Sequence, residues 1–231
     1  MKNVSIILAG GSGRRTGNDI PKQFLQVAGK TILEHTTEKF DTHPAIDEIT
    51  IVIPEKELEH AQELFPKEKL HKKLNLIIGG KERYHSTLSA LDFYRNETCN
   101  LLIHDAARPL VTHRIISDVI EALQKYHAVN VAIPATDTII ETNSTHEVIE
   151  RIPMRDFLYM VQTPQGFYNK TLARAYEKAL QDPDFKTTDD CSVVKNYLPE
   201  EAIGIIQGDT KNLKITHAED IALLEYLLQH V

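Results

Sequence analysis

Short, nearly continuous runs of apolar and β-branched residues recur along the chain, and stretches with helical periodicity separate them. The runs cover residues 5–10, 49–54, 74–80, 100–105 and 128–135. Runs of this kind are typical of strands that are buried on both faces, as in a parallel sheet covered by helices. The alternation of strand and helix signals therefore predicts an α/β fold with a doubly wound, mostly parallel sheet.

Two stretches have the periodicity of amphipathic helices. Residues 113–126 place their apolar side chains on one helical face. The stretch 216–230 begins with Thr216 and Glu219, which have the spacing of a capping box, and continues as an apolar stripe. No linker, repeat or low-complexity tract interrupts the 231 residues. We therefore expect one domain, 1–231, built on a Rossmann-like sheet.

Residues 138–152 break this alternation. They form two strand-like runs around the polar turn 143–146, which indicates a β-hairpin inserted into the α/β chain. The hairpin is either a flap on its own chain or an arm, at about 138–160, that reaches a partner. An isolated hairpin is marginal in water, whereas two arms crossing at a two-fold axis would bury each other's apolar faces. A homodimer is therefore expected.

Composition excludes several classes of protein. Lys and Arg number 26 against 33 Asp and Glu, so the formal net charge is −7, whereas a nucleic-acid binder would carry a basic face. No apolar run approaches the ~20 residues of a membrane span, and the first residues lack the features of a signal peptide. The two cysteines, Cys99 and Cys191, match no metal-binding spacing. We expect a reduced, cytoplasmic protein with two small, buried cysteines.

The segment 8–24, LAGGSGRRTGNDIPKQF, follows the first predicted strand, where an open α/β sheet binds phosphate. It is rich in glycine, with Gly10, Gly11 and Gly13 near its start, and it contains three cations, Arg14, Arg15 and Lys22. Glycines let backbone N–H groups approach a phosphate closely. Thr16 stands where a dinucleotide fingerprint needs its third glycine, and the P-loop pattern is also missing. A tight turn would need no cations, so the segment predicts an anionic ligand.

This segment resembles the signature of sugar- and polyol-phosphate nucleotidyltransferases. Six further segments resemble the IspD/TarI cytidylyltransferases in order and spacing: 79–91, 103–111, 134–139, 161–167, 188–194 and 208–216. Together the seven motifs span nearly the whole chain. The resemblance implies a CTP-dependent cytidylyltransferase that uses Mg²⁺, transfers CMP to a polyol phosphate and releases pyrophosphate. It also implies a homodimer whose arm carries Arg155 to the neighbour's acceptor site, so that the active site is shared.

Such a reaction needs charge neutralisation more than proton transfer. A phosphate monoester is largely dianionic at neutral pH and needs no general base, so positioning and electrostatics carry the catalysis. The resemblance implies that Arg15 and Lys22 stabilise the pentacovalent α-phosphate and that Arg14 shares this role, unless Arg14 is simply exposed. Pro21 restrains the backbone before Lys22. Thr16 replaces a methionine that is common in relatives, which should change packing and not chemistry.

Asp105 ends the predicted strand 100–105, a position from which a carboxylate points into the ligand crevice. The resemblance implies that it holds Mg²⁺ against the triphosphate, and the alternatives are a helix cap or an ion pair with Arg108. Asp209 is a candidate second metal ligand, although a turn residue is the favoured interpretation. His104 is expected to be structural. The resemblance places CTP against Leu8, Ala9, Gly10, Gly11, Gly79, Gly80, Arg83, Ser86 and Arg108. For Arg83, a solvated helix cation is the alternative.

The acceptor side is implied by a third set of matches: Thr138, Arg155, Thr163, Thr188 and Lys214. Arg155 and Lys214 are the cations expected to bind the acceptor phosphate. Lys214 lies in a strand-like apolar context, where burial without an anion would be costly. The segment 152–165, IPMRDFLYMVQTPQ, resembles the branch that uses D-ribitol 5-phosphate. The alternative acceptor is 2-C-methyl-D-erythritol 4-phosphate, whose enzymes share the HDAARP motif.

A nucleotide-sugar glycosyltransferase is the alternative from a different class. Such enzymes use a similar sheet and a DxD metal motif, and Asp182 and Asp184 have that spacing. These residues follow a helix-like stretch and no buried strand, so we expect them in a loop. A non-catalytic binding module is disfavoured because the whole set of charged positions is intact.

Overall fold

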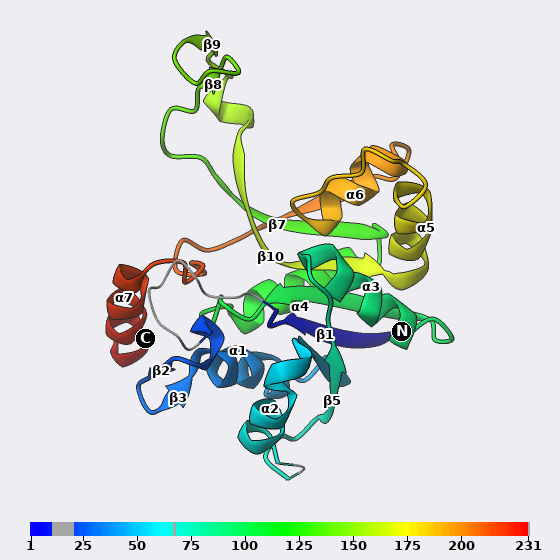
Figure 1. Ribbon diagram of the computed structural model, residues 1–231, viewed down its shortest axis with the longest axis vertical. Coiled ribbons are helices and arrows are strands. Elements are labelled where there is room, and N and C mark those ends of the chain that lie inside the picture. The colour runs from blue at the N-terminus through cyan, green and yellow to red at the C-terminus, as the bar shows by residue number, and fades with distance from the viewer. Residues whose placement is uncertain (11–20, 67, 231) are drawn as a thin grey trace.

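The computed structural model describes residues 1–10, 21–66 and 68–230, and a seven-stranded sheet forms its centre (Figure 1). The strand order is β11-β7-β10-β6-β1-β4-β5. The strands are β1 (Lys2–Leu8), β4 (Glu48–Ile53), β5 (Lys73–Ile78), β6 (Cys99–Asp105), β7 (Ala128–Pro134), β10 (Tyr159–Tyr168) and β11 (Ile203–Gln207). Within this sheet β10 pairs antiparallel with β6 and β7, and the other pairs are parallel. The predicted α/β, mostly parallel sheet is confirmed.

Helices cover both faces of the sheet, as expected for a doubly wound fold. They are α1 (Ile32–Asp41), α2 (Leu58–Leu64), α3 (Arg83–Phe93), α4 (His113–Ala122), α5 (Asn169–Ala179), α6 (Asp190–Tyr197) and α7 (Ala218–Gln229). Short 3-10 helices are η2 (Lys22–Phe24), η3 (Glu55–Glu57) and η4 (Arg155–Phe157), and small strand pairs are β2 (Gln26–Val27) with β3 (Lys30–Thr31) and β8 (Glu141–Thr142) with β9 (Ile149–Arg151). In the described chain, no helix is long and apolar enough to cross a membrane.

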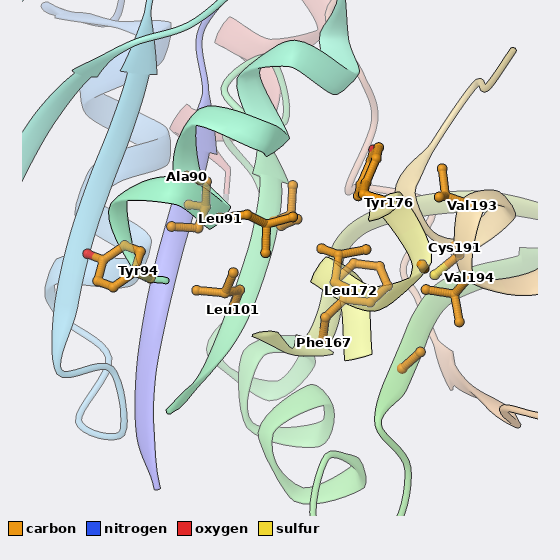
Figure 2. Packing of buried hydrophobic residues seen from close by; sticks show 14 of the residues in the cluster. Ala90, Leu91, Tyr94, Leu101, Phe167, Leu172, Tyr176, Cys191, Val193 and Val194 are labelled. Carbon is orange, nitrogen blue, oxygen red and sulfur yellow. The ribbon is translucent and has the colours of Figure 1, made fainter. Parts of the chain in front are cut away.

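The alternation of side chains along each strand explains why the apolar runs are continuous. Leu101 and Ile103 of β6 pack in one core with α3, α5 and α6, whereas Leu102 packs in a second core with α1 and α4. Figure 2 shows the first core, with Leu91 of α3 and Tyr176 of α5 among its labelled residues. A central strand such as β6 is therefore buried at successive positions, because both of its faces are covered.

The cysteines and the two predicted amphipathic helices are mostly as expected. Cys99 and Cys191 are free and buried, and burial raises the pKa of the Cys99 thiol to about 11. The apolar face of α4 is buried. The predicted capping box of the C-terminal helix was wrong by one residue, because the Asp220 carboxylate, and not Glu219, accepts from the backbone N–H groups of Thr216 and His217. A carboxylate in the first turn satisfies otherwise unpaired N–H groups in either case.

Strands β8 and β9 form the predicted hairpin, and Figure 1 shows it projecting away from the sheet beyond β7 and β10. We call residues 138–160 the arm. Its apolar side chains are exposed: Ile139, Ile140, Val148, Ile149, Ile152, Met154, Phe157, Tyr159 and Met160. Phe157 is 77% exposed and Met154 is 69% exposed. The arm therefore does not fold onto the body of its own chain.

Candidate active site

A cavity of ≈ 330 Å³ lies at the carboxyl ends of β1 and β6, where Leu8 pairs with Asp105. This is the edge at which an open α/β sheet binds ligands. Its lining includes these residues predicted from sequence: Leu8, Ala9, Gly10, Lys22, Gly80, Arg83, Ser86, Asp105 and Lys214. Gly11, Gly13, Arg14, Arg15 and Thr16 lie outside the described residues. The cavity thus brings together residues from segments as far apart as Leu8 and Lys214.

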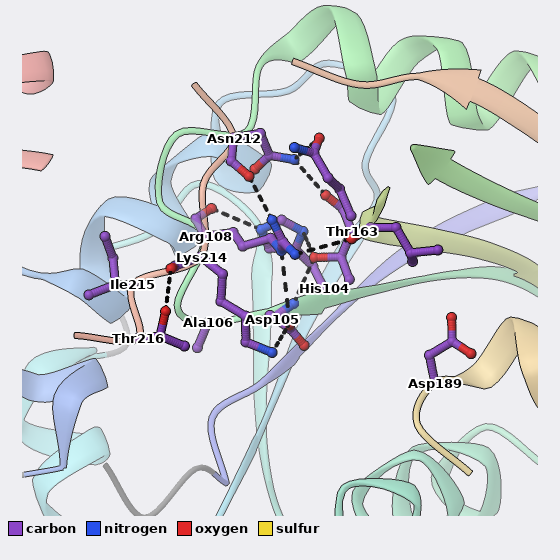
Figure 3. A network of polar contacts seen from close by, with 12 residues as sticks. His104, Asp105, Ala106, Arg108, Thr163, Asp189, Asn212, Lys214, Ile215 and Thr216 are labelled. Atoms are coloured by element: carbon purple, nitrogen blue, oxygen red, sulfur yellow. Dashed lines mark hydrogen bonds and ion pairs between the residues drawn. The ribbon is translucent and has the colours of Figure 1, made fainter. Parts of the chain in front are cut away.

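Asp105 is the charged centre of the cavity. Lys214 Nζ lies 2.7 Å from its Oδ2, Arg83 Nε lies 3.6 Å from its Oδ1, and Arg108 Nε lies 3.9 Å from its Oδ2. Burial alone would raise the pKa of Asp105, but these three cations hold it well below its ordinary value. The carboxylate is therefore ionised at neutral pH. Figure 3 shows Lys214 and Arg108 meeting Asp105 from one side.

A buried histidine fixes the backbone of Asp105. His104 Nε2 lies 3.0 Å from the carbonyl oxygen of Arg108, which can only accept, so this nitrogen carries the proton. Nδ1 then accepts from the Thr163 hydroxyl at 2.9 Å, and the Thr163 oxygen accepts from the Asp105 N–H at 3.1 Å. Burial lowers the pKa of His104 to about 4, so the ring is neutral. This geometry agrees with the structural role expected for His104.

The same chain of contacts engages Thr163, which was predicted on the acceptor side. Its side chain is buried between His104 and Asp105, and it is not part of the cavity lining. Thr163 therefore orients Asp105 within this chain. The hydroxyl proton, committed to His104, is not available to an acceptor in this geometry.

Arg108 lies behind the cavity and braces the segment that carries Lys214. Its Nη1 donates to the Asn212 carbonyl at 2.7 Å, and the Asn212 side chain donates to the Thr163 carbonyl at 2.9 Å (Figure 3). Arg108 is not part of the lining, so in this chain it orders the wall and does not form it. Asp209 is also outside the lining, and its Oδ1 accepts from the Lys211 N–H at 2.8 Å. That contact is the turn geometry favoured from sequence.

Lys22 begins η2 directly after Pro21, and its Nζ donates to the Ile215 carbonyl at 2.8 Å. This contact joins the end of the glycine-rich segment to the segment that contains Lys214, which is irregular and not the strand suggested by its sequence. Gln23, to which sequence reasoning gave no role, is buried and donates to the Ala9 carbonyl at 2.7 Å. Its position inside the PKQF motif was the available signal. Lys81, Glu82, Ala106 and Ala107 also line the cavity without having been predicted.

Glycines 79 and 80 leave no room for side chains. A Cβ at Gly79 would lie 2.5 Å from Ser86 Oγ and 3.0 Å from Val52 Cγ1, and one at Gly80 would overlap His85. These glycines let the end of β5 run close against α3. Arg83, the first residue of α3, donates from Nη1 to Asp190 at 2.6 Å. The alternative interpretation from sequence, a freely solvated helix cation, is therefore wrong for Arg83.

The acceptor set is not assembled by one chain. Lys214 lines the cavity, but Thr138, Arg155 and Thr188 are exposed and lie outside the lining. Arg155 belongs to the arm, where its Nη1 donates to the Thr136 carbonyl at 3.2 Å.

The DxD spacing of Asp182 and Asp184 does not coincide with the end of a strand. Both residues lie in a turn after α5, as expected from the sequence.

One carboxylate of the cavity, that of Asp105, fits a divalent ion that is shared with phosphate oxygens. Among residues 1–10, 21–66 and 68–230, no cluster of three or more His, Cys, Asp or Glu side chains is placed to hold a metal. Mg²⁺ needs no such cluster in phosphate-binding sites, where one or two carboxylates, substrate oxygens and water complete its shell. Asp105 supplies one ionised carboxylate at the cavity, which is sufficient for this mode.

Comparison with known proteins gives matches over nearly the whole chain. The family model described as IspD, 2-C-methyl-D-erythritol 4-phosphate cytidylyltransferase, matches residues 3–230. The chain is 46% identical over 99% of its length to the bifunctional ribulose 5-phosphate reductase/CDP-ribitol pyrophosphorylase Bcs1 of Haemophilus influenzae, and it spans 48% of that relative. It is 41% identical to the 2-C-methyl-D-erythritol 4-phosphate cytidylyltransferase of Thermobifida fusca, covering 98% of this chain and 93% of the relative.

Comparison with solved structures gives matches to the same group of enzymes. The crystal structure of 4-diphosphocytidyl-2C-methyl-D-erythritol synthase from Anaerococcus prevotii matches with a TM-score of 0.87 at 30% identity, covering 99% of this chain and 96% of that one. The Francisella tularensis 2-C-methyl-D-erythritol 4-phosphate cytidylyltransferase matches with a TM-score of 0.81 at 27% identity, covering 98% and 99%.

Proposed function

The chain belongs to the IspD family of CTP-dependent cytidylyltransferases, and from that premise we propose that it transfers CMP from CTP to D-ribitol 5-phosphate. The products are CDP-ribitol and pyrophosphate. The observation that carries this choice is the segment 152–165, in which Arg155 and Tyr159 follow the ribitol-type pattern. The 46% identity to a relative named as a CDP-ribitol pyrophosphorylase supports it, although the chain matches about half of that relative.

The second candidate acceptor is 2-C-methyl-D-erythritol 4-phosphate. It is favoured by the 41% identity to a relative with that name, which the chain covers almost completely. Both candidates are phosphate monoesters of short polyols, so the same cations would serve either one. Discrimination must come from groups that contact the polyol hydroxyls.

The cavity suits CTP and a reaction without a general base. We assign the pyrimidine to the wall of Gly79, Gly80 and Ser86, where Gly80 and Ser86 line the cavity and the base would pack against backbone. Lys22 neutralises the charge that develops at the α-phosphorus, together with Arg14 and Arg15 in the part of the chain that is not described. Preorganised cations act most strongly on charge that develops in the transition state. The Ile215 carbonyl holds Lys22 in place for this role.

Asp105 is the residue to which we assign Mg²⁺. A bound divalent ion would neutralise the triphosphate and the leaving pyrophosphate. His104 and Thr163 keep the Asp105 backbone in one position, and Lys214 contacts the same carboxylate at 2.7 Å. Lys214 is thereby placed beside the nucleotide site, where we expect it to bind the acceptor phosphate. Asp209, engaged in its turn, is not needed as a second ligand.

The remaining acceptor residues come, in this proposal, from a second copy of the chain. Thr138 and Arg155 lie on the exposed arm, away from the cavity of their own chain. Two arms that cross would bury the exposed apolar side chains of both and deliver Arg155 to the partner's cavity. The proposed enzyme is a homodimer with shared sites.

Pyrophosphate release with CTP and Mg²⁺ tests the proposal. Ribitol 5-phosphate and 2-C-methyl-D-erythritol 4-phosphate are compared as acceptors at equal concentration, and kcat/KM is measured for each. We expect a higher kcat/KM with ribitol 5-phosphate. A higher value with 2-C-methyl-D-erythritol 4-phosphate would assign the protein to the second candidate, and release of CDP from CDP-sugars would indicate the glycosyltransferase alternative.

A further inference from the structure

Arg83 is held from behind by a carboxylate that never reaches the cavity. Its Nη1 lies 2.6 Å from Oδ2 of Asp190, while its Nε faces Asp105 Oδ1 at 3.6 Å. The Arg83 side chain is 29% exposed and lines the cavity, whereas the Asp190 side chain is fully buried. The Arg83 guanidinium therefore connects the buried Asp190 carboxylate, which we call the anchor, to the surface of the cavity.

The anchor is itself fixed in one orientation. The Tyr176 hydroxyl donates to Asp190 Oδ1 at 2.7 Å, so each carboxylate oxygen has its own partner. The Asp190 N–H donates to Gln165 Oε1 at 3.2 Å, which ties the start of α6 to β10. Tyr176 is almost completely buried on α5, in the core that Figure 2 shows. Rotation of the carboxylate would break at least one of these contacts.

Stability alone does not explain this arrangement. Removing an ion pair from water costs about as much free energy as the pair returns, and apolar side chains of similar size often do as well. The surroundings of Tyr176 are apolar, with Leu172, Val193 and Val194 in the same core. A buried carboxylate in such an apolar core has a clear use when it must hold the Arg83 guanidinium in one direction.

We propose that Asp190 and Tyr176 are positioning residues that aim the Arg83 guanidinium at the phosphates of bound CTP. This inference rests on the proposed role of Arg83 in CTP binding and deepens it. Asp190 is the first residue of α6, so its ion pair with Arg83 also connects the start of α6 to the cavity. Neither Asp190 nor Tyr176 touches the ligand in this proposal.

The chain contains a matched control for the chemistry of the anchor. Glu48 is also a buried carboxylate held by a buried tyrosine and a cation, with Tyr94 donating at 2.9 Å and Lys2 at 2.7 Å. It begins β4, at the end of the strand opposite to the cavity. Glu48→Gln therefore removes an equivalent charge without touching the nucleotide site.

The test measures equilibrium binding of CTP with Mg²⁺ to the full chain, together with the melting temperature of each variant. Asp190→Asn should raise the Kd of CTP about tenfold, the effect of losing one charge-assisted hydrogen bond. Arg83→Ala should raise it at least as much. The double variant should bind no more weakly than Arg83→Ala alone, because Asp190 acts through Arg83. Glu48→Gln should lower the melting temperature and leave the Kd unchanged.

The outcomes separate positioning from a merely structural role. An unchanged Kd in folded Asp190→Asn, or additive losses in the double variant, would overturn the proposal. If Asp190→Asn does not fold, Tyr176→Phe keeps the ion pair and removes one hydroxyl; we expect a Kd about threefold higher, and an unchanged Kd would be the contrary result. The measurement uses no acceptor, so a wrong choice between the two polyol phosphates would appear only in the pyrophosphate assay and would not affect this result.

Discussion

Two inactive variants should restore activity when their subunits exchange, if the arm acts on the neighbouring chain. Lys22 lines the cavity of the body, and Arg155 lies on the projecting arm (Figure 1). A mixed dimer of Lys22→Ala and Arg155→Ala would then contain one site with both lesions and one site with neither. The single intact site should turn over at the wild-type rate.

The expected activity of the mixture follows from the proposed dimer with two shared sites. Random exchange of equal amounts makes half of all dimers mixed, and each mixed dimer has one intact site out of two, so the mixture should reach about a quarter of wild-type activity. Each variant alone should retain ~10⁻² of it or less when the acceptor is below its KM, because Lys22→Ala loses a group that stabilises developing charge and Arg155→Ala loses a charged contact with the acceptor phosphate. The expected rise on mixing is therefore at least about 25-fold, which a pyrophosphate-release assay resolves easily.

The control pairs two lesions on the body. Lys22→Ala mixed with Asp105→Asn leaves every site with a damaged body, because Asp105 lies in the same cavity as Lys22. This mixture should stay inactive whether the arm works on its own chain or on its partner. Subunit exchange is verified by native mass spectrometry with one variant isotopically labelled. A Lys22→Ala and Arg155→Ala mixture that exchanges and stays inactive would refute the shared site.

Three further predictions concern the body of the protein. Lys22→Ala should lower kcat ~10²–10³-fold with an unchanged circular dichroism spectrum, and a near-normal kcat would remove Lys22 from the transition state. Packing of the base against the backbone of Gly79 and Gly80 and against Ser86 should give CTP a much higher kcat/KM than ATP or GTP, and comparable values would contradict this placement of the base. Burial raises the pKa of Glu48, but Lys2 and its other partners lower it to about 2, below its usual value of 4.5, so this group stabilises the fold above pH 4.5 and that stabilisation is lost as the pH falls towards 2. Acid unfolding of Glu48→Gln should lack this pH dependence, and an acid transition identical to that of the wild type would show that Glu48 does not contribute.

The sequence predicted most of the fold because burial on both faces leaves a strong signal. The run 100–105 is apolar at successive positions, and the strand Cys99–Asp105 indeed packs against helices on either side. The end of that run also identified Asp105, since the carboxyl end of a buried strand is where ligands bind. The capping box of the last helix was predicted with Glu219 and not Asp220 for a local reason. The two carboxylates are adjacent, and the helix starts one residue later than expected.

Long-range partners could not be predicted in the same way. Arg83 and Asp190 are 107 residues apart, and no spacing rule connects them. Arg108 shows the same limit, since its motif does not indicate that its guanidinium donates to the carbonyl of Asn212, 104 residues away; its predicted contact with CTP stays a prediction. Local patterns record which residues a backbone element needs. Which distant side chains meet depends on the packing of several elements together, and that information is spread over the whole chain.

The charge balance of the cavity explains how an acidic protein attracts a triphosphate. The whole chain has a formal net charge of −7, yet within the described residues the cavity lining carries Lys22, Lys81, Arg83 and Lys214 against Glu82 and Asp105. Four positive charges against two negative ones leave a local excess of two. In a partly buried cavity these charges are screened much less than surface charges. The acidic remainder of the surface repels anions elsewhere, so the cavity is where a polyphosphate is attracted.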